Sequence, residues 1–298
     1  MRYPFKILRR ITRSLHFLMF LNGFLLASMF YFLMESTYEN GLFASIKADV
    51  QTGLDANDNA DSLFVKSMHE SYHLMHNRLA TFANGSLLGP ENGLFHSTSV
   101  DLMTTNGACG SYSQVLARIL RSFNYPVRIA QMKAKGRFGA HNVVEANDGK
   151  HWILLDPTFD LYFVRPDAQL ASFADVHQDW PYYSRQVPAD YDPSYRYEDV
   201  RYTNWTKIPI LFPLLKKVLT LTIGAERTNG MSIRTIWMNS YSVWFYVFLV
   251  LEITLFVITC KRYVRFIIIP RRNDYSAAPN PTFAKYVPVQ ENDQSWVQ

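Results

Sequence analysis

Two long apolar segments constrain the fold of this chain more than any other feature of its sequence. Residues 14–34 contain no Asp, Glu, Lys or Arg, and residues 237–260 carry one charged side chain, Glu252. Each segment is long enough to cross about 30 Å of hydrocarbon as a helix. The first exceeds the roughly 7–15 apolar residues of a signal peptide, which favours an uncleaved signal anchor. We therefore predict two transmembrane helices with a folded region between them.

Basic residues flank these two segments on the sides away from the folded region. Five Lys or Arg residues lie within residues 1–13, and five more lie within residues 261–272. By the positive-inside rule, residues 1–13 form a cytoplasmic segment and residues 261–298 a cytoplasmic tail. The region between the helices is then extracytoplasmic, periplasmic in a bacterial-type cell, and the lipid bilayer is a partner of the chain.

The distribution of charge and cysteine excludes two classes of protein. The net charge is +5, but subtracting the ten flanking basic charges leaves −5 for the remainder, so we expect no nucleic-acid partner. The chain has only two cysteines, too few for a disulfide-stapled secreted scaffold. Hydrophobic residues make up 48% of the chain, which is enough for a globular core.

Three stretches connect the predicted membrane helices to the outer domain. Residues 35–62 are polar and rich in turn residues, so we predict a linker, with Asp61 or Ser62 as the N-cap of the next helix. Residues 208–224 are apolar but contain two prolines and a lysine pair, which is costly inside a bilayer. We predict an amphipathic helix lying at the membrane interface there, and a second linker over residues 225–236.

Glu252 lies at about the same predicted depth in the bilayer as Asn22. Each is nine residues from a cytoplasmic basic residue, which places it about 13 Å deep at 1.5 Å per residue. We interpret the two side chains as hydrogen-bonded partners that join the helices, in preference to a transport role.

Cys109 carries the strongest chemical signal in the predicted outer domain, residues 63–207. Apolar positions spaced by three and four residues predict one helix over residues 63–82 and another that begins near Cys109 and ends before Pro126. A cysteine in the first turn of a helix has its thiolate stabilised by free backbone amides and the helix dipole. Cys109 is also the only cysteine of the outer region, so it has no disulfide partner within it.

A predicted β-hairpin brings a histidine and an aspartate together. Three strand-like runs follow the helix, over residues 127–132, 140–146 and 151–156. The last two flank Asp148-Gly149, a strong hairpin signal. A two-residue loop at this dipeptide places His141 directly opposite Asp156, on the same face of the sheet. The aspartate can then accept a hydrogen bond from the imidazole and orient it.

These pieces resemble the core of the transglutaminase-like superfamily. The matching elements lie within residues 63–165 and are listed here in chain order: Gly107-Ala108-Cys109, Leu116-Ala117, Leu120, Tyr125-Pro126-Val127-Arg128, His141, Val144-Glu145, Trp152 and Asp156-Pro157-Thr158. The resemblance implies an α+β, papain-like domain in which a helix bearing the cysteine packs on an antiparallel sheet. It also implies that Cys109 is the nucleophile, His141 the general base and then acid, and Asp156 the residue that orients His141. The backbone amide of Cys109 would contribute to an oxyanion hole, whose side-chain donor the sequence does not identify.

The resemblance leaves the reaction open, because members of the superfamily include crosslinking enzymes, peptidases, amidases and inactive binding modules. We expect a thiol acyl-transfer enzyme that needs no cofactor and acts on peptide or protein amides, by hydrolysis or by crosslinking. The alternative is an inactive module that binds a cell-envelope peptide or glycan.

A second motif suggests different chemistry. His69-Glu70-Ser71-Tyr72-His73 fits the pattern HExxH, which on a helix places two histidines one turn apart beside a glutamate that can activate water. A catalytic zinc ion usually takes three protein ligands, and no third ligand follows at a known spacing. We therefore predict no metal at the site and retain a zinc hydrolase at His69, Glu70 and His73 as the lesser alternative.

The end of the outer region is rich in tyrosine and tryptophan. Eight of these residues lie within residues 180–205 among prolines and charged side chains. Such rings could line a groove for a peptide or a glycan, but we favour an extended segment that packs on the domain and ends at the membrane interface.

Overall fold

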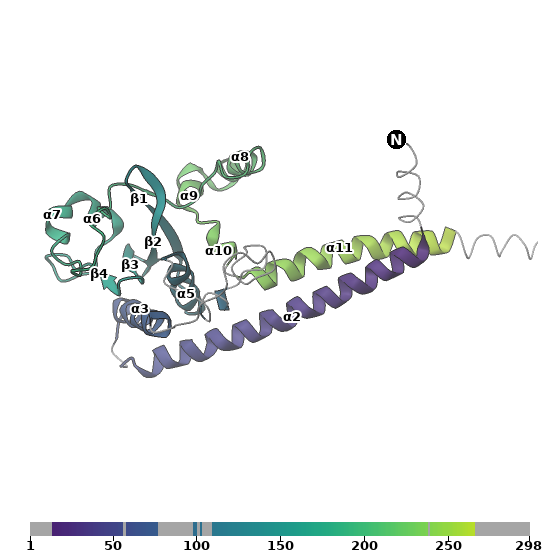
Figure 1. Cartoon of the computed structure of the whole chain (residues 1–298), viewed down its shortest axis with the longest axis horizontal. Coiled ribbons are helices and arrows are strands. Elements are labelled where there is room, and N and C mark those ends of the chain that lie inside the picture. Colours follow the sequence, from purple (N-terminus) through teal and green to yellow (C-terminus); the bar gives the residue numbers. More distant parts are fainter. Residues whose placement is uncertain are drawn as a thin grey trace, which may run out of the picture. The chain divides into compact units, whose positions relative to one another are not determined.

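The computed structural model describes residues 14–55, 58–76, 98–99, 102, 109–237 and 239–265 (Figure 1). The predicted cytoplasmic segment 1–13, most of the tail 261–298 and the turn before Cys109 lie outside these residues. The chain divides into two units, one formed by residues 27–248 and one that contains residues 14–26 and 249–265.

The larger unit is α+β, as predicted, with a five-stranded antiparallel sheet in the order β4-β3-β2-β1-β5. The strands are β1 (Val127–Ala134), β2 (Arg137–Asn147), β3 (Trp152–Asp156), β4 (Leu161–Tyr162) and β5 (Val200–Arg201). The three longest match the strands expected from the sequence, whereas β4 and β5 have two residues each and carry too little pattern to be predicted.

Each face of the sheet is buried by a different part of the chain. Helices α3 (Ala60–His76) and α5 (Cys109–Ser122) cover one face (Figure 1). Their core residues Phe64, Met68, Leu116 and Leu120 pack against Ile129, Val144, Ile153 and Leu155 of the strands. The other face lies under helices α6 (Phe173–Gln178) and α7 (Trp180–Tyr183) and the tyrosine-rich segment that follows them. The tyrosine-rich segment therefore packs on the domain, as predicted, although residues 180–183 are helical and not extended. That it ends at a membrane interface stays a prediction.

Helix α2 (Leu15–Thr52) is much longer than the predicted membrane span, so the prediction of a linker from residue 35 is wrong as far as residue 52. At 1.5 Å per residue, its 38 residues extend about 57 Å, nearly twice the thickness of the hydrocarbon core. The reason is a second apolar stripe: Phe43, Ile46 and Val50 recur at helical spacing and are buried against Val115 and Ile119 of α5. This packing outweighs the turn tendency of Asn40-Gly41.

The N-cap of α3 also differs from the prediction. The helix begins at Ala60, and the side chain of Asn59 accepts a hydrogen bond from the Ser62 amide at 2.9 Å. Asn59 is therefore the capping residue, and Asp61 and Ser62 lie within the first turn.

Among the described residues, two helices are long and apolar enough to cross a membrane, α2 and α11 (Ser240–Tyr263). In the larger unit, their side chains meet where Ser36 and Ser242 hydrogen-bond at 2.6 Å. In the smaller unit, Asn22 donates to Thr259 at 3.0 Å and not to Glu252, so the predicted Asn22–Glu252 pair is wrong. Glu252 is buried, and its Oε2 has no hydrogen-bond partner among the described residues.

Three short helices, α8 (Leu211–Ile223), α9 (Ala225–Gly230) and α10 (Arg234–Trp237), lead to α11. The predicted linker 225–236 is therefore partly helical. None of the residues of α8 is buried. One side of α8 carries exposed aliphatic residues, Leu211, Leu214, Leu215, Val218 and Leu221. At 100° per residue, Lys216 and Thr220 lie on the opposite side, and Lys217 lies at the edge of the aliphatic side. This pattern fits the interfacial helix expected from the sequence.

We predict that α8 lies on lipid through this aliphatic side. The double substitution Leu214→Glu/Leu221→Glu should increase amide hydrogen exchange in residues 211–223 of the full chain in nanodiscs, because two carboxylates oppose insertion into the interface. The matched control Thr220→Glu places a carboxylate on the opposite side and should leave exchange unchanged. Equal exchange in all three proteins would contradict the assignment.

Candidate active site

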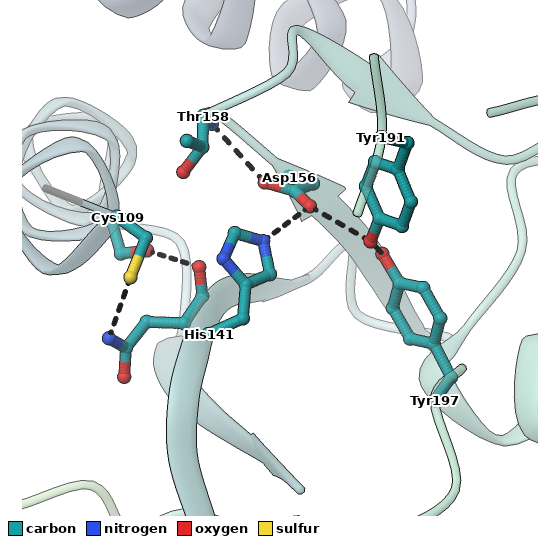
Figure 2. Close-up of polar contacts among 8 residues, drawn as sticks. Cys109, His141, Asp156, Thr158, Tyr191 and Tyr197 are labelled. Carbon is teal, nitrogen blue, oxygen red and sulfur yellow. Dashed lines mark hydrogen bonds and ion pairs between the residues drawn. The ribbon is translucent and has the colours of Figure 1, made fainter. Parts of the chain in front are cut away.

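The three residues of the predicted triad come from three elements and lie together in the structure (Figure 2). Cys109 is the first residue of α5, His141 lies in β2, and Asp156 ends β3. His141 Nε2 lies 2.6 Å from Asp156 Oδ2, and the two side chains are 1% and 0% exposed. The other ring nitrogen of His141 lies on the side of Cys109 (Figure 2).

The register of the hairpin differs from the prediction by two residues. Asn147 pairs with Trp152 and Val144 with Leu155, so the loop has four residues, 148–151, and His141 is not directly opposite Asp156. The Asp148 side chain stabilises the longer loop by accepting hydrogen bonds from the amides of Lys150 and His151. A shift of two residues leaves each side chain on the same face, so His141 and Asp156 still meet, as diagonal neighbours.

Cys109 is half-buried at the start of its helix. Burial raises the pKa of its thiol. Three effects together lower this pKa by more than burial raises it: a hydrogen bond with His141, the positive charge of that imidazole and a hydrogen bond from Asn142. The Asn142 amide Nδ2 donates to Cys109 Sγ at 3.3 Å. The surroundings therefore favour the thiolate, the nucleophilic form of cysteine.

The charge of His141 is stabilised in turn by Asp156. Burial alone would lower the pKa of the imidazole, but the Asp156 carboxylate, with a smaller contribution from Cys109, raises it to about 10. Asp156 Oδ1 accepts a hydrogen bond from the Thr158 amide at 3.2 Å, and Oδ2 accepts one from the Tyr191 hydroxyl at 3.4 Å. The arrangement can hold a thiolate–imidazolium pair.

Three tyrosines complete the surroundings of His141 and Asp156. The hydroxyls of Tyr191 and Tyr197 lie 2.8 Å apart, and both tyrosines are buried. The ring of Tyr195 stacks on the imidazole of His141, with centroids 4.4 Å apart and an angle of 10° between the planes. The sequence singled out this tyrosine-rich segment by composition only, because nothing in the local pattern shows that it returns to the histidine.

Asn142 and Arg234 are further residues of the site that the sequence reasoning missed. Arg234 Nη1 donates to Asn142 Oδ1 at 3.1 Å, and the Asn142 backbone carbonyl accepts from the Ser113 hydroxyl at 2.9 Å. Asn142 follows His141 directly, which is the one local signal that could have drawn attention to it.

The HExxH residues do not join the triad. His69, on α3, lies 2.6 Å from Asp160 through Nδ1, and His73 is exposed. Within the part of the chain that the structure describes, there is no group of three or more His, Cys, Asp or Glu side chains that could hold a metal ion. Glu70 is therefore not part of such a group. The geometry therefore gives no support to the zinc alternative.

Two pockets, of about 420 and 480 Å³, lie around Arg128 and Tyr202 and include no triad residue. Arg128 is paired with the buried Glu145 at 2.9 Å and stacks on the rings of Trp152 and Tyr202. These contacts satisfy the guanidinium within the domain, so we assign the cluster a structural role.

Comparison of the chain with protein-family models, with curated proteins and with solved structures found no match.

The hydroxyl of Tyr191 should stabilise the domain through Asp156 and Tyr197. Tyr191→Phe removes both hydrogen bonds and should lower the free energy of unfolding by about 1–3 kcal/mol. Tyr195→Phe is the matched control, because the Tyr195 hydroxyl has no hydrogen bond among the described residues, and it should change little. Chemical denaturation of the full chain in detergent measures the free energy of unfolding of both variants. Equal losses of stability in Tyr191→Phe and Tyr195→Phe would contradict the role of the Tyr191 hydroxyl.

The raised pKa of His141 predicts a pH dependence of stability. The imidazole binds its proton more tightly in the folded state, so its contribution is complete below about pH 6.5 and is lost as the pH rises toward about 10. Asp156→Asn removes the main cause of the raised pKa. The lowered pKa of Cys109 changes stability in the opposite direction, so both proteins also carry Cys109→Ala. Between pH 6.5 and 10 the stability of the protein with Asp156 should then fall relative to Asp156→Asn, by at most about 1.4 kcal/mol per pH unit. Parallel denaturation curves across this range would contradict the assignment.

Proposed function

We propose that this protein is a membrane-anchored, transglutaminase-like thiol acyl-transfer enzyme that acts on peptide or protein amides. The observation that carries the proposal is the cluster of Cys109, His141 and Asp156, in which the thiol pKa is lowered and the imidazole is paired with a buried carboxylate. A helix that bears the cysteine packs on an antiparallel sheet that bears the histidine and the aspartate, as in a papain-like core.

The proposed chemistry begins with attack of the Cys109 sulfur on the carbonyl carbon of an amide. The C–S bond forms, the carbonyl becomes an oxyanion, and His141 holds the proton of the thiol. When the C–N bond breaks, His141 gives this proton to the leaving amine, and a thioester remains on Cys109. Water or a second amine then adds to the thioester carbonyl and gives a proton to His141. The C–S bond breaks, the sulfur regains the proton, and an acid or a new amide is released. We favour hydrolysis, because water is always available.

The proposed location is the outer face of the cytoplasmic membrane. The basic clusters at both ends of the chain favour a topology with both termini inside. The enzyme would then act on envelope peptides or proteins, while α2 and α11 hold it at the membrane.

The test is the pH dependence of Cys109 alkylation by iodoacetamide. It uses the full chain in detergent with Cys260→Ser, since Cys260 is the other cysteine and is exposed. We expect a thiol pKa below the ordinary value of about 8.5 that rises in His141→Ala, because the imidazolium stabilises the thiolate. Cys109→Ala in the same background corrects for labelling of other groups.

An ordinary or unreactive thiol in the wild type would overturn the proposal and favour the alternative of an inactive binding module. A low pKa that His141→Ala leaves unchanged would show that the histidine does not activate the thiol. With the expected result, the next step is to assay peptide amides for release of ammonia or amine.

A further inference from the structure

Asn142 presents its amide group to the reactive sulfur. The residue is 4% exposed, and Nδ2 donates to Cys109 Sγ at 3.3 Å. Its carbonyl oxygen is occupied by Arg234 Nη1 at 3.1 Å, which fixes the orientation of the amide, with Nδ2 toward the sulfur and Oδ1 away from it. A buried donor held in this way is preorganised for a negative charge that develops beside the sulfur.

The backbone amide of Cys109 is a second donor at the same place. Cys109 is the first residue of α5, and the first amides of a helix have no acceptor within the helix. When the sulfur attacks a carbonyl carbon, the oxygen on that carbon is only two bonds from the sulfur. Groups that contact the sulfur are therefore close enough to donate a hydrogen bond to this oxygen. The site thus offers two donors for this oxygen, one from the backbone of α5 and one from a side chain of β2.

We infer that Asn142 supplies the side-chain donor of the oxyanion hole and that Arg234 positions it. The inference rests on the proposed function. When the sulfur adds to the carbonyl carbon, the C=O electron pair moves onto oxygen, and Asn142 Nδ2–H and the Cys109 N–H donate to that oxyanion. When the C–N bond breaks, the pair returns to the carbonyl and both hydrogen bonds weaken.

The guanidinium of Arg234 strengthens this donor. A hydrogen bond from a cation to Oδ1 polarises the amide and makes its N–H groups better donors. Arg234 belongs to α10, which contacts the catalytic helix where Arg121 Nη1 donates to the Thr235 carbonyl at 3.3 Å. The donor is therefore held by the segment that leads into α11.

The experiment compares two reactions of Cys109 in the full chain with Cys260→Ser. Alkylation by iodoacetamide needs a thiolate but forms no oxyanion, whereas acylation by p-nitrophenyl acetate passes through one. Limiting rate constants at high pH are compared, so that differences in thiol pKa cancel. Asn142→Ala should lower the acylation rate about 10²–10³-fold and leave alkylation within about threefold.

Three further variants separate the donor from the fold. Asn142→Asp keeps the shape of the side chain but lacks the N–H donor, so it should lose acylation as Asn142→Ala does. Arg234→Met should lose part of the acylation rate and Arg234→Lys should recover some of it, with alkylation unchanged in both. Asn147→Ala, on the same strand and away from the sulfur, should behave as the wild type.

The outcomes distinguish this inference from the proposed function. If the wild type reacts with both reagents and Asn142→Ala or Asn142→Asp retains its acylation rate, the assignment of Asn142 is wrong while the proposed function stands. The assignment of Asn142 is also wrong if Asn142→Ala lowers the rates of alkylation and acylation by the same factor. If the wild-type thiol reacts with neither reagent, the proposed function fails and this inference fails with it.

Discussion

The ion pair between His141 and Asp156 is the interaction on which the rest of the site depends. Both side chains are almost completely buried, and an unpaired charge at either position would cost several kcal/mol. The carboxylate accepts two further hydrogen bonds, from the Thr158 amide on Oδ1 and from the Tyr191 hydroxyl on Oδ2. The tyrosine-rich segment that covers this face of the sheet supplies the second of these donors.

Helix α5 is the element through which α2 and α10 contact the site. It packs against the C-terminal part of α2, where Phe43 and Val50 are buried beside Val115. Near the C-terminal end of α5, Arg121 contacts α10, and Arg234 of α10 donates to Asn142, the residue that follows His141. The larger unit thus combines the sheet, α5, the C-terminal part of α2 and the beginning of α11 in one set of contacts. Rearrangement of α2 or α10 would change the environment of Cys109.

The hairpin shows how a site can be predicted when its detailed register is not. Side chains alternate between the two faces of a sheet, so a register shift of two residues leaves each side chain on the same face. The pair of His141 and Asp156 was therefore predicted from alternation and the turn signal, although the loop is two residues longer than expected. The prediction for Asn22 and Glu252 depended on depth alone, without a packing partner, and Thr259 takes the bond instead.

The sequence by itself determined the elements whose residues carry a local pattern. These are the two apolar helices, the helix that begins at Cys109 and the three main strands, because hydrophobic periodicity and turn residues act over short distances. Tertiary structure alone decided the extension of α2, the return of Tyr191 and Tyr195 to the imidazole, and the meeting of Asn142 with Arg234, which are 92 residues apart. Such contacts join segments distant in the chain, and only the packing of the whole domain brings them together.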